Sequence, residues 1–281
     1  MKINGIVLVN KDRGMSSNSV VNKVKHILQA DKAGHLGTLD VLGEGLLPVT
    51  LGKATKLFDY YLTKNKIYRT IFKFGETTAT LDLEGEITNR DDRVVSPEDI
   101  LKVLPKFVGK QLQMPPLYSA KKINGKKAYE LAREGSTDVA LKPKEIKMYS
   151  INLIKQLEKN TFLFEIHCSS GTYIRSVCRD LATALSTYGV MQYIQRTRCG
   201  DFDLKDAYTI NDIENGKFKI IELDSLFDYD KLSLDEQQAS KLLNGVKIKY
   251  AKDGVYRAYC EQFLGLVTVK DGLMSFKLRL I

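Results

Sequence analysis

The sequence contains no run of apolar residues long enough to cross a lipid bilayer. The chain starts with MKINGIVLVNKDRG, in which a short apolar run ends in mixed charge and no small-residue cleavage site follows. These features predict a buried strand over Ile6–Val9 and argue against a signal peptide. We therefore expect a soluble, cytoplasmic protein that makes no contact with a membrane.

Cysteine and histidine are too scarce and too widely spaced to suggest a metal centre. The four cysteines form no C-x-x-C pair, and three histidines are the other candidate soft ligands: Cys168, Cys178, Cys199 and Cys260, with His26, His35 and His167. Structural zinc sites need close pairs of such ligands. We expect no metal, and free thiols in a reducing compartment.

The chain also lacks a glycine-rich phosphate loop of the P-loop or dinucleotide type, an internal repeat and a low-complexity tract. These absences disfavour an ATPase or a dehydrogenase. The chain does have an excess of basic residues, with 43 Lys and Arg against 34 Asp and Glu and a net charge of +9. Such a charge favours a polyanionic partner, although charge alone does not identify a nucleic acid.

Local patterns predict a chain of helices and strands with a domain boundary at residue 230, where short alternating strands replace longer elements. A glycine-rich loop is expected over 35–52, and Asn124-Gly125 should form a turn before a helix that ends at Gly135. Capping residues and apolar spacing predict further helices after Ser16 or Ser17 and over 54–62, 97–104, 174–185 and 236–243. Strands are expected over 67–74, 146–154 and 162–168, and near 246, 255, 264 and 276.

Two charged residues stand in unusual places. Asp40 is the lone aspartate of the segment HLGTLDVLGEGLLPVTLG, where it could simply be a turn former. Arg175 falls in the first turn of a predicted helix, where the helix dipole disfavours a cation by up to roughly 1 kcal/mol. Arg179 follows one turn later and adds like-charge repulsion. An anion should therefore lie beside Arg175, either a carboxylate of this chain or a phosphate of a ligand.

Five segments together resemble the TruB family of tRNA pseudouridine synthases. AGHLGTLDVLGEGLLPVTLGKATKL is similar to the catalytic motif of that family, and the other four occur in the family's order: LVNKDRGMSS, KIYRTIFKFG, QMPPLYSAKKINGKKAYELAR and CSSGTYIRSVCRDL. The resemblance covers about the first two thirds of the chain. The tail from about residue 230 resembles, more weakly, the small β-rich PUA-type RNA-binding domain.

The resemblance implies an α+β fold: a catalytic domain over 1–229 with a mixed, mainly antiparallel sheet and flanking helices, and a PUA-like domain over 230–281. It implies isomerisation of uridine 55 in the T-loop of tRNA to pseudouridine, with base flipping. No cofactor is expected, because the bonds are exchanged within one nucleotide. We expect a monomer that binds the T-arm and needs no protein partner.

The resemblance also assigns roles to individual residues. Asp40 would be the catalytic carboxylate, Arg175 its cationic partner, and Tyr68 the ring that stacks on the uracil and helps to remove its C5 proton. The substrate-binding residues would be His35, which takes the place of the extruded base, Tyr173, which lines the pocket, and Lys11 and Ile194.

The chain departs from the family at two positions, since Val41 and Asp12 stand where the family has prolines. Neither departure removes a reacting group, and each should cost about 1 kcal/mol or less. Two alternatives remain at this stage: a related pseudouridine synthase that acts on another RNA, and a non-catalytic protein that binds or folds RNA.

Overall fold

The structure is a computed structural model of the chain, and it describes residues 3–119, 122–123, 126–127 and 141–281. The expected turn at Asn124-Gly125 and the helix expected to end at Gly135 lie outside the described residues. Among the described residues, no helix is both long and apolar enough to span a membrane. No group of three or more His, Cys, Asp or Glu side chains in this part of the chain is arranged to hold a metal ion.

A nine-stranded sheet forms the centre of the molecule. Seven strands follow one another across it in the order β1 (Gly5–Lys11), β3 (Glu44–Leu51), β12 (Gly189–Cys199), β4 (Lys66–Phe74), β11 (Thr161–Cys168), β10 (Lys144–Glu158) and β7 (Gly109–Gln113). Two short strands pair with its members, β2 (Ala33–His35) with β3 and β13 (Phe202–Asp203) with β12. Apart from a short parallel contact between β12 and β3, the pairs are antiparallel. The mixed, mainly antiparallel sheet predicted from the sequence is therefore confirmed.

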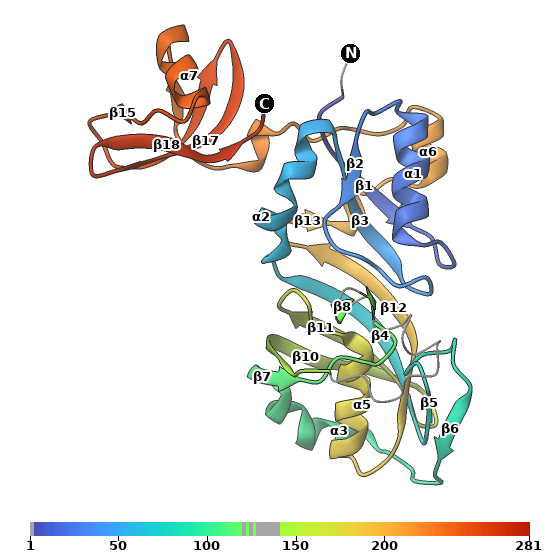
Figure 1. Cartoon of the computed structure of the whole chain (residues 1–281). Helices are drawn as coiled ribbons and strands as arrows, with labels where there is room; N and C mark the ends of the chain where they lie inside the picture. The colour runs from blue at the N-terminus through green and yellow to red at the C-terminus, as the bar shows by residue number, and fades with distance from the viewer. Residues whose placement is uncertain (1–2, 120–121, 124–125, 128–140) are drawn as a thin grey trace.

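The long strand β12 joins two halves of this sheet, as Figure 1 shows. One half holds β1, β2 and β3 beside the helices α1 (Ser17–Ile27) and α6 (Ile210–Glu214). The other half holds the remaining long strands with α3 (Pro97–Val103) and α5 (Ile174–Ala184). A residue near the middle of β12 thus lies between the two halves.

Short elements complete the main body of the molecule: α2 (Phe58–Leu62), the two-stranded pairs β5 (Glu76–Thr78) with β6 (Ile87–Arg90) and β8 (Lys122–Ile123) with β9 (Lys126–Lys127), and the 3-10 turns 52–57, 104–107, 204–206 and 224–226.

Local sequence signals explain where several of these elements begin. Ser16 caps α1 by accepting a hydrogen bond from the Ser19 amide at 3.0 Å. Ser96 and Asp99 form a reciprocal capping box at the start of α3, with Pro97 at its first position. The predicted stripe of α5 is buried, since Ile174, Val177, Leu181 and Leu185 all lie in the hydrophobic core against β4 and β11. These predictions are confirmed.

Two predictions were wrong in part. The segment 35–52 is not a continuous loop, because Glu44–Leu51 forms β3 and pairs with β1 from Gly45 to Leu51. Gly43, Gly45 and Pro48 suggested a turn, but burial between neighbouring strands determines the conformation. The helix expected over 54–62 is α-helical only over Phe58–Leu62 and begins as a 3-10 turn at Gly52–Leu57.

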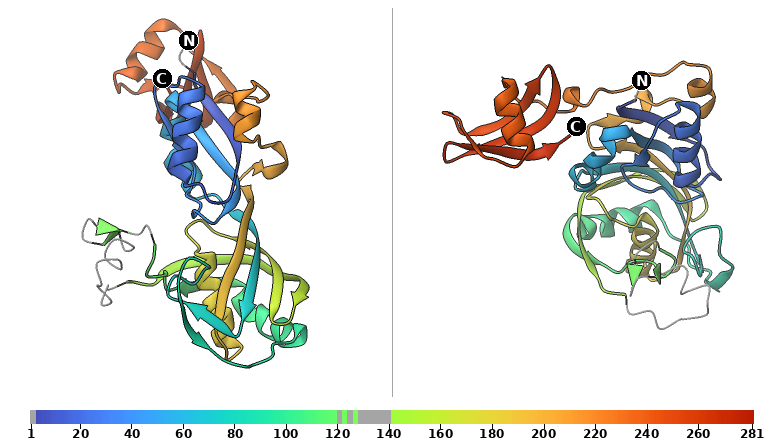
Figure 2. Two further views of the ribbon diagram at one scale, coloured as in Figure 1. Left: turned by 90° about the vertical axis from the view of Figure 1, so that its right-hand side faces the viewer. Right: turned by 45° about the horizontal axis from the view of Figure 1, so that its top comes forward.

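The C-terminal region forms a separate five-stranded sheet. Its order is β14 (Lys231–Ser233), β16 (Gly254–Cys260), β17 (Gln262–Lys270), β18 (Leu273–Arg279) and β15 (Ile248–Lys249), with α7 (Glu236–Leu243) beside it. The views of Figures 1 and 2 place this sheet next to the half of the molecule that holds β1, far from α5. Leu266 and Leu280 pack in one apolar cluster with Tyr61 and Phe202 of the main body. The β-rich tail is confirmed, whereas the boundary at residue 230 stays a prediction.

Candidate active site

Asp40 lies on a short loop between β2 and β3, and side chains from α1 and β1 hold that loop. The Ser17 hydroxyl accepts a hydrogen bond from the Leu39 amide and donates one to the Leu39 carbonyl, each at 2.9 Å. The Gly43 amide donates to the Asp40 carbonyl at 3.0 Å and closes the turn. The Leu39 side chain is buried in the core, whereas the Asp40 side chain is 47% exposed. The loop therefore presents one carboxylate at the surface on a fixed backbone.

Arg175 meets this carboxylate from the first turn of α5. Its Nη2 lies 3.1 Å from Oδ2 of Asp40, its Nη1 lies 3.3 Å from Oδ2 of Asp82, and Nη1 donates to the Thr80 carbonyl at 3.0 Å. The Arg175 side chain is only 8% exposed. The prediction that an anion must lie beside this arginine is confirmed, and the anions are two carboxylates of the chain itself.

Asp82 is a site residue that the sequence reasoning missed. Its side chain is 6% exposed and lies in the turn between β5 and β6. The Thr80 hydroxyl and the Glu84 amide donate to its Oδ1 at 2.5 and 3.0 Å, so its second oxygen is free to face Arg175. In the sequence it stands in the polar, glycine-containing segment LDLEGE, which is typical of an ordinary turn. The one sequence signal for such a residue was the expectation that an anion lies beside Arg175. That expectation did not identify which acidic residue supplies the anion.

The predicted Tyr68 and Ile194 come to the same place from neighbouring strands. Tyr68 of β4 and Ile194 of β12 are buried, and both belong to the apolar cluster that contains Leu39 and Ile174. These two neighbours precede Asp40 and Arg175 directly in the chain. Burial raises the pKa of the Tyr68 hydroxyl, and the Arg196 guanidinium opposes that rise. The Tyr68 hydroxyl is therefore protonated at physiological pH.

Tyr173 is held at the N-terminus of α5 by a buried glutamine. Its amide donates to Oε1 of Gln113 at 2.8 Å, and Nε2 of Gln113 donates back to the Tyr173 carbonyl at 3.1 Å. Since Gln113 ends β7, this pair ties the last strand of the sheet to the start of α5. Tyr173 is half-buried, two residues before Arg175.

His35 lies in β2 opposite Val49 of β3 and is half-buried. Its Nδ1 has no hydrogen-bond partner among the residues that the structure describes. Burial and, to a lesser extent, the charge of Arg196 lower the pKa of His35. The imidazole is therefore neutral at pH 7, and no ion pair or hydrogen bond between it and Asp40 occurs in the described chain.

Lys11 lies beneath the Asp40 loop rather than on the surface. Its ammonium donates to the carbonyls of Met15, Asp12 and Val41 at 2.6, 3.0 and 3.4 Å, and the residue is fully buried. Burial lowers the pKa of Lys11 to about 8, against the opposing effects of Asp12 and Asp40. This geometry gives Lys11 a part in holding the backbone just after Asp40, and contact with a substrate stays a prediction.

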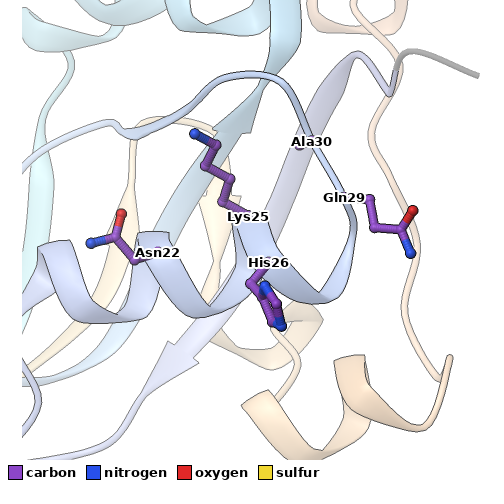
Figure 3. A pocket seen from close by; sticks show the side chains of 5 residues that line it. All are labelled: Asn22, Lys25, His26, Gln29 and Ala30. Carbon is purple, nitrogen blue, oxygen red and sulfur yellow. The ribbon is translucent and has the colours of Figure 1, made fainter.

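A surface hollow elsewhere on the molecule does not resemble this site. It lies along α1 and the turn that follows, away from the Ser17 end that contacts the Asp40 loop (Figure 3). In Figure 3 the side chains of Lys25 and His26 point away from one another, and Gln29 points away from both. The hollow is lined by Asn22, Lys25, His26, Gln29 and Ala30. Its polar groups do not converge on one point, so this hollow is not a candidate active site.

Comparison with known proteins identifies the family of the chain. Residues 25–174 match the profile described as "TruB family pseudouridylate synthase (N terminal domain)". A "tRNA pseudouridine synthase B" of Clostridium kluyveri is 38% identical over 281 aligned residues, which cover 96% of this chain and 96% of the relative. The protein of the same name from Caldanaerobacter subterraneus subsp. tengcongensis is 38% identical over 250 residues, or 89% of this chain and 87% of the relative.

A solved structure titled "Structure of H/ACA RNP bound to a substrate RNA containing 2'-deoxyuridine" matches with a TM-score of 0.69 over 99% of this chain and 85% of that chain. At 20% identity, this likeness supports the fold alone. The family match and these relatives define a pseudouridine synthase, an isomerase of uridine in RNA. Within that class, the chain belongs to the TruB family.

Proposed function

We propose that this protein converts uridine 55 in the T-loop of tRNA to pseudouridine. In this isomerisation the bond from ribose C1′ to N1 of uracil breaks, and a bond from C1′ to C5 forms. The base loses its C5 proton and gains one at N1, so nothing is oxidised and no group is consumed. The relatives named tRNA pseudouridine synthase B support tRNA as the substrate.

One observation is central to the proposal: the Asp40 carboxylate is half-exposed while the arginine that binds it is buried. A carboxylate that an RNA encloses would tend to protonate, and a cation 3.1 Å away favours its charged form. Positive charge develops at the sugar when the glycosidic bond breaks. An ionised carboxylate can stabilise that charge, trap it covalently or remove a sugar proton. We assign Asp40 to this role and Arg175 to the support of its charge.

The remaining residues would handle the base. Tyr68 would stack on the uracil and help to remove the C5 proton, and Ile194 and Tyr173 would form the walls of the pocket. The neutral His35 would occupy the place that the extruded base leaves. Lys11 would act on the substrate through the Asp40 loop, because its ammonium binds the carbonyls around that loop.

RNA binding would combine base flipping with phosphate contacts. Chemistry at C1′ and C5 requires the uridine to leave its stack, and a loop nucleotide costs less to extrude than a paired one. The net charge of +9 supports contacts with the backbone of the T-arm, while the shape of the arm selects it. We assign catalysis to residues 1–229 and a PUA-like RNA-binding role to 230–281. We expect a monomer that acts without a protein partner.

The test uses a synthetic T-arm stem-loop with tritium at C5 of uridine 55. The wild-type chain should release the label to water without any added cofactor. A matched RNA with the label on a neighbouring loop uridine should release none. Tight binding without release from either RNA would identify a non-catalytic RNA-binding protein, and release from the neighbouring uridine would contradict the proposed position.

A further inference from the structure

Arg196 is the largest fully buried side chain in the described part of the chain, and its charge is not neutralised there. The residue lies in β12 and is 1% exposed. No carboxylate of the described residues lies within ion-pair distance of its guanidinium. A buried charge without a counter-ion costs folding free energy. The charge also acts on its surroundings, since it contributes to lowering the pKa values of His35, Lys11 and Lys66.

The guanidinium binds backbone carbonyls on both sides of Asp40, one in its loop and one in β3. Its Nη2 donates to the Gly37 carbonyl at 3.0 Å, three residues before Asp40, and its Nε donates to the Leu46 carbonyl at 2.8 Å, six residues after it. The backbone of β12 also approaches this loop closely. A Cβ on Gly45, whose φ is +95°, would lie 2.5 Å from the Arg196 carbonyl oxygen. This contact requires glycine, and it keeps the loop against β12.

The same arginine is also the direct neighbour of Tyr68. In the pairing of β12 with β4, Arg196 stands opposite Tyr68, and both residues are buried. Arg196 pairs with Gly45 of β3 on one side of β12 and with Tyr68 of β4 on the other, so it lies where the half with the Asp40 loop meets the half with Tyr68. The Arg196 side chain therefore contacts the loop of the proposed catalytic carboxylate, and its strand β12 pairs with the strand that carries the proposed stacking ring.

We propose that Arg196 is a positioning residue that sets the Asp40 carboxylate relative to the Tyr68 ring by bridging the Gly37 and Leu46 carbonyls. The inference rests on the roles proposed for Asp40 and Tyr68. The planar guanidinium donates along several fixed directions and can hold two carbonyls at once. A lysine ammonium at this position keeps the charge and loses the fixed geometry.

The proposal is tested with Arg196→Lys, Arg196→Gln and the matched control Arg198→Lys. Arg198 lies two residues further along β12, is 52% exposed and pairs with Asp203 at 3.4 Å. For each variant, the folded fraction, the affinity for the T-arm stem-loop and the single-turnover rate at saturating enzyme are measured.

The rate per folded Arg196→Lys enzyme should fall by about 100-fold, as expected for a misplaced reacting group. Its affinity should stay within about twofold of the wild type, because Arg196 is buried and does not reach the surface to contact a phosphate. Arg196→Gln should lose at least as much rate, and Arg198→Lys should match the wild type.

Nuclear magnetic resonance titration of His35 checks for a loss of packing, because burial is the larger cause of its lowered pKa. In Arg196→Lys, which keeps the charge, and in Arg198→Lys the midpoint of His35 should stay in place, whereas loosened packing would raise it. An unchanged rate in Arg196→Lys, a loss confined to affinity, or failure of both Arg196 variants to fold at any temperature would overturn the proposal. Absence of label release by the wild type and by Arg198→Lys would instead refute the proposed function.

Discussion

Replacement of Arg175 should separate its contribution to catalysis from its contribution to folding. The two carboxylates that it binds differ in exposure, with Asp82 at 6% and Asp40 at 47%. Arg175→Ala leaves Asp82 buried without its partner, which costs roughly 3 to 5 kcal/mol for a fully buried pair. Asp40 is half-exposed, so water can solvate its carboxylate when the arginine is gone. Loss of the Arg175–Asp40 pair therefore lowers the stability less than loss of the Arg175–Asp82 pair. We expect the melting temperature of Arg175→Ala to fall by roughly 6 to 20 °C.

Arg175→Lys should instead affect mainly the rate. One ammonium cannot reproduce the three contacts at 3.0, 3.1 and 3.3 Å to Thr80, Asp40 and Asp82. Loss of one hydrogen bond to a charged group is worth about 1.5 to 3 kcal/mol, or roughly 10- to 150-fold in rate if the bond acts in the transition state. Affinity for the T-arm should change little, because the lost contact is within the protein.

The assay is single-turnover release of tritium from the T-arm stem-loop at saturating enzyme, beside binding constants and melting curves. Arg179→Lys is the matched control, since Arg179 lies one turn further along α5 and binds Asp180 and the Met114 carbonyl instead. It should keep the wild-type rate. An unchanged rate with weakened binding in Arg175→Lys would refute the catalytic role of its pair with Asp40 and indicate a role in RNA binding instead.

Two further predictions concern salt and pH. The affinity for tRNA should fall steeply with salt concentration, because phosphate contacts release counterions, and a flat dependence would separate the basic surface from RNA binding. The rate should fall as pH rises through about 8, where the Lys11 ammonium loses its proton, and Lys11→Met should lack that step. The pKa of Lys11 is lower in the folded state, so burial of its charge lowers the free energy of unfolding below pH 8. This loss is relieved as pH rises from 8 towards 10.5. The wild type should therefore gain stability relative to Lys11→Met over this range, and a constant difference would contradict the lowered pKa.

Elements with local signals could be predicted from the sequence. Caps at Ser16 and Ser96 and the apolar stripe of α5 located three helices. Aromatic and β-branched residues located β4, and a polar turn after β10 located β11. Strand β3 could not be predicted, because its conformation follows from pairing with β1, while Gly45 and Pro48 favour a turn locally.

In the candidate site too, residues with a local sequence signal could be predicted and residues defined by distant contacts could not. The helix dipole indicated that Arg175 needs an anion, and Asp40 stood out on its loop. Asp82 and Arg196 have no such local signal, because a turn aspartate and a strand arginine are ordinary in sequence. Their importance comes from partners that are 93 and 150 residues away in the chain, namely Arg175 for Asp82 and the Leu46 carbonyl for Arg196.

The most direct test of the account is the variant Asp40→Asn, assayed with the T-arm stem-loop labelled at C5 of uridine 55. The amide keeps the shape of the side chain and removes its charge. The account predicts a folded protein with the affinity of the wild type and no release of label above background in a single-turnover experiment. Release well above background would contradict the assignment of Asp40 as the catalytic carboxylate.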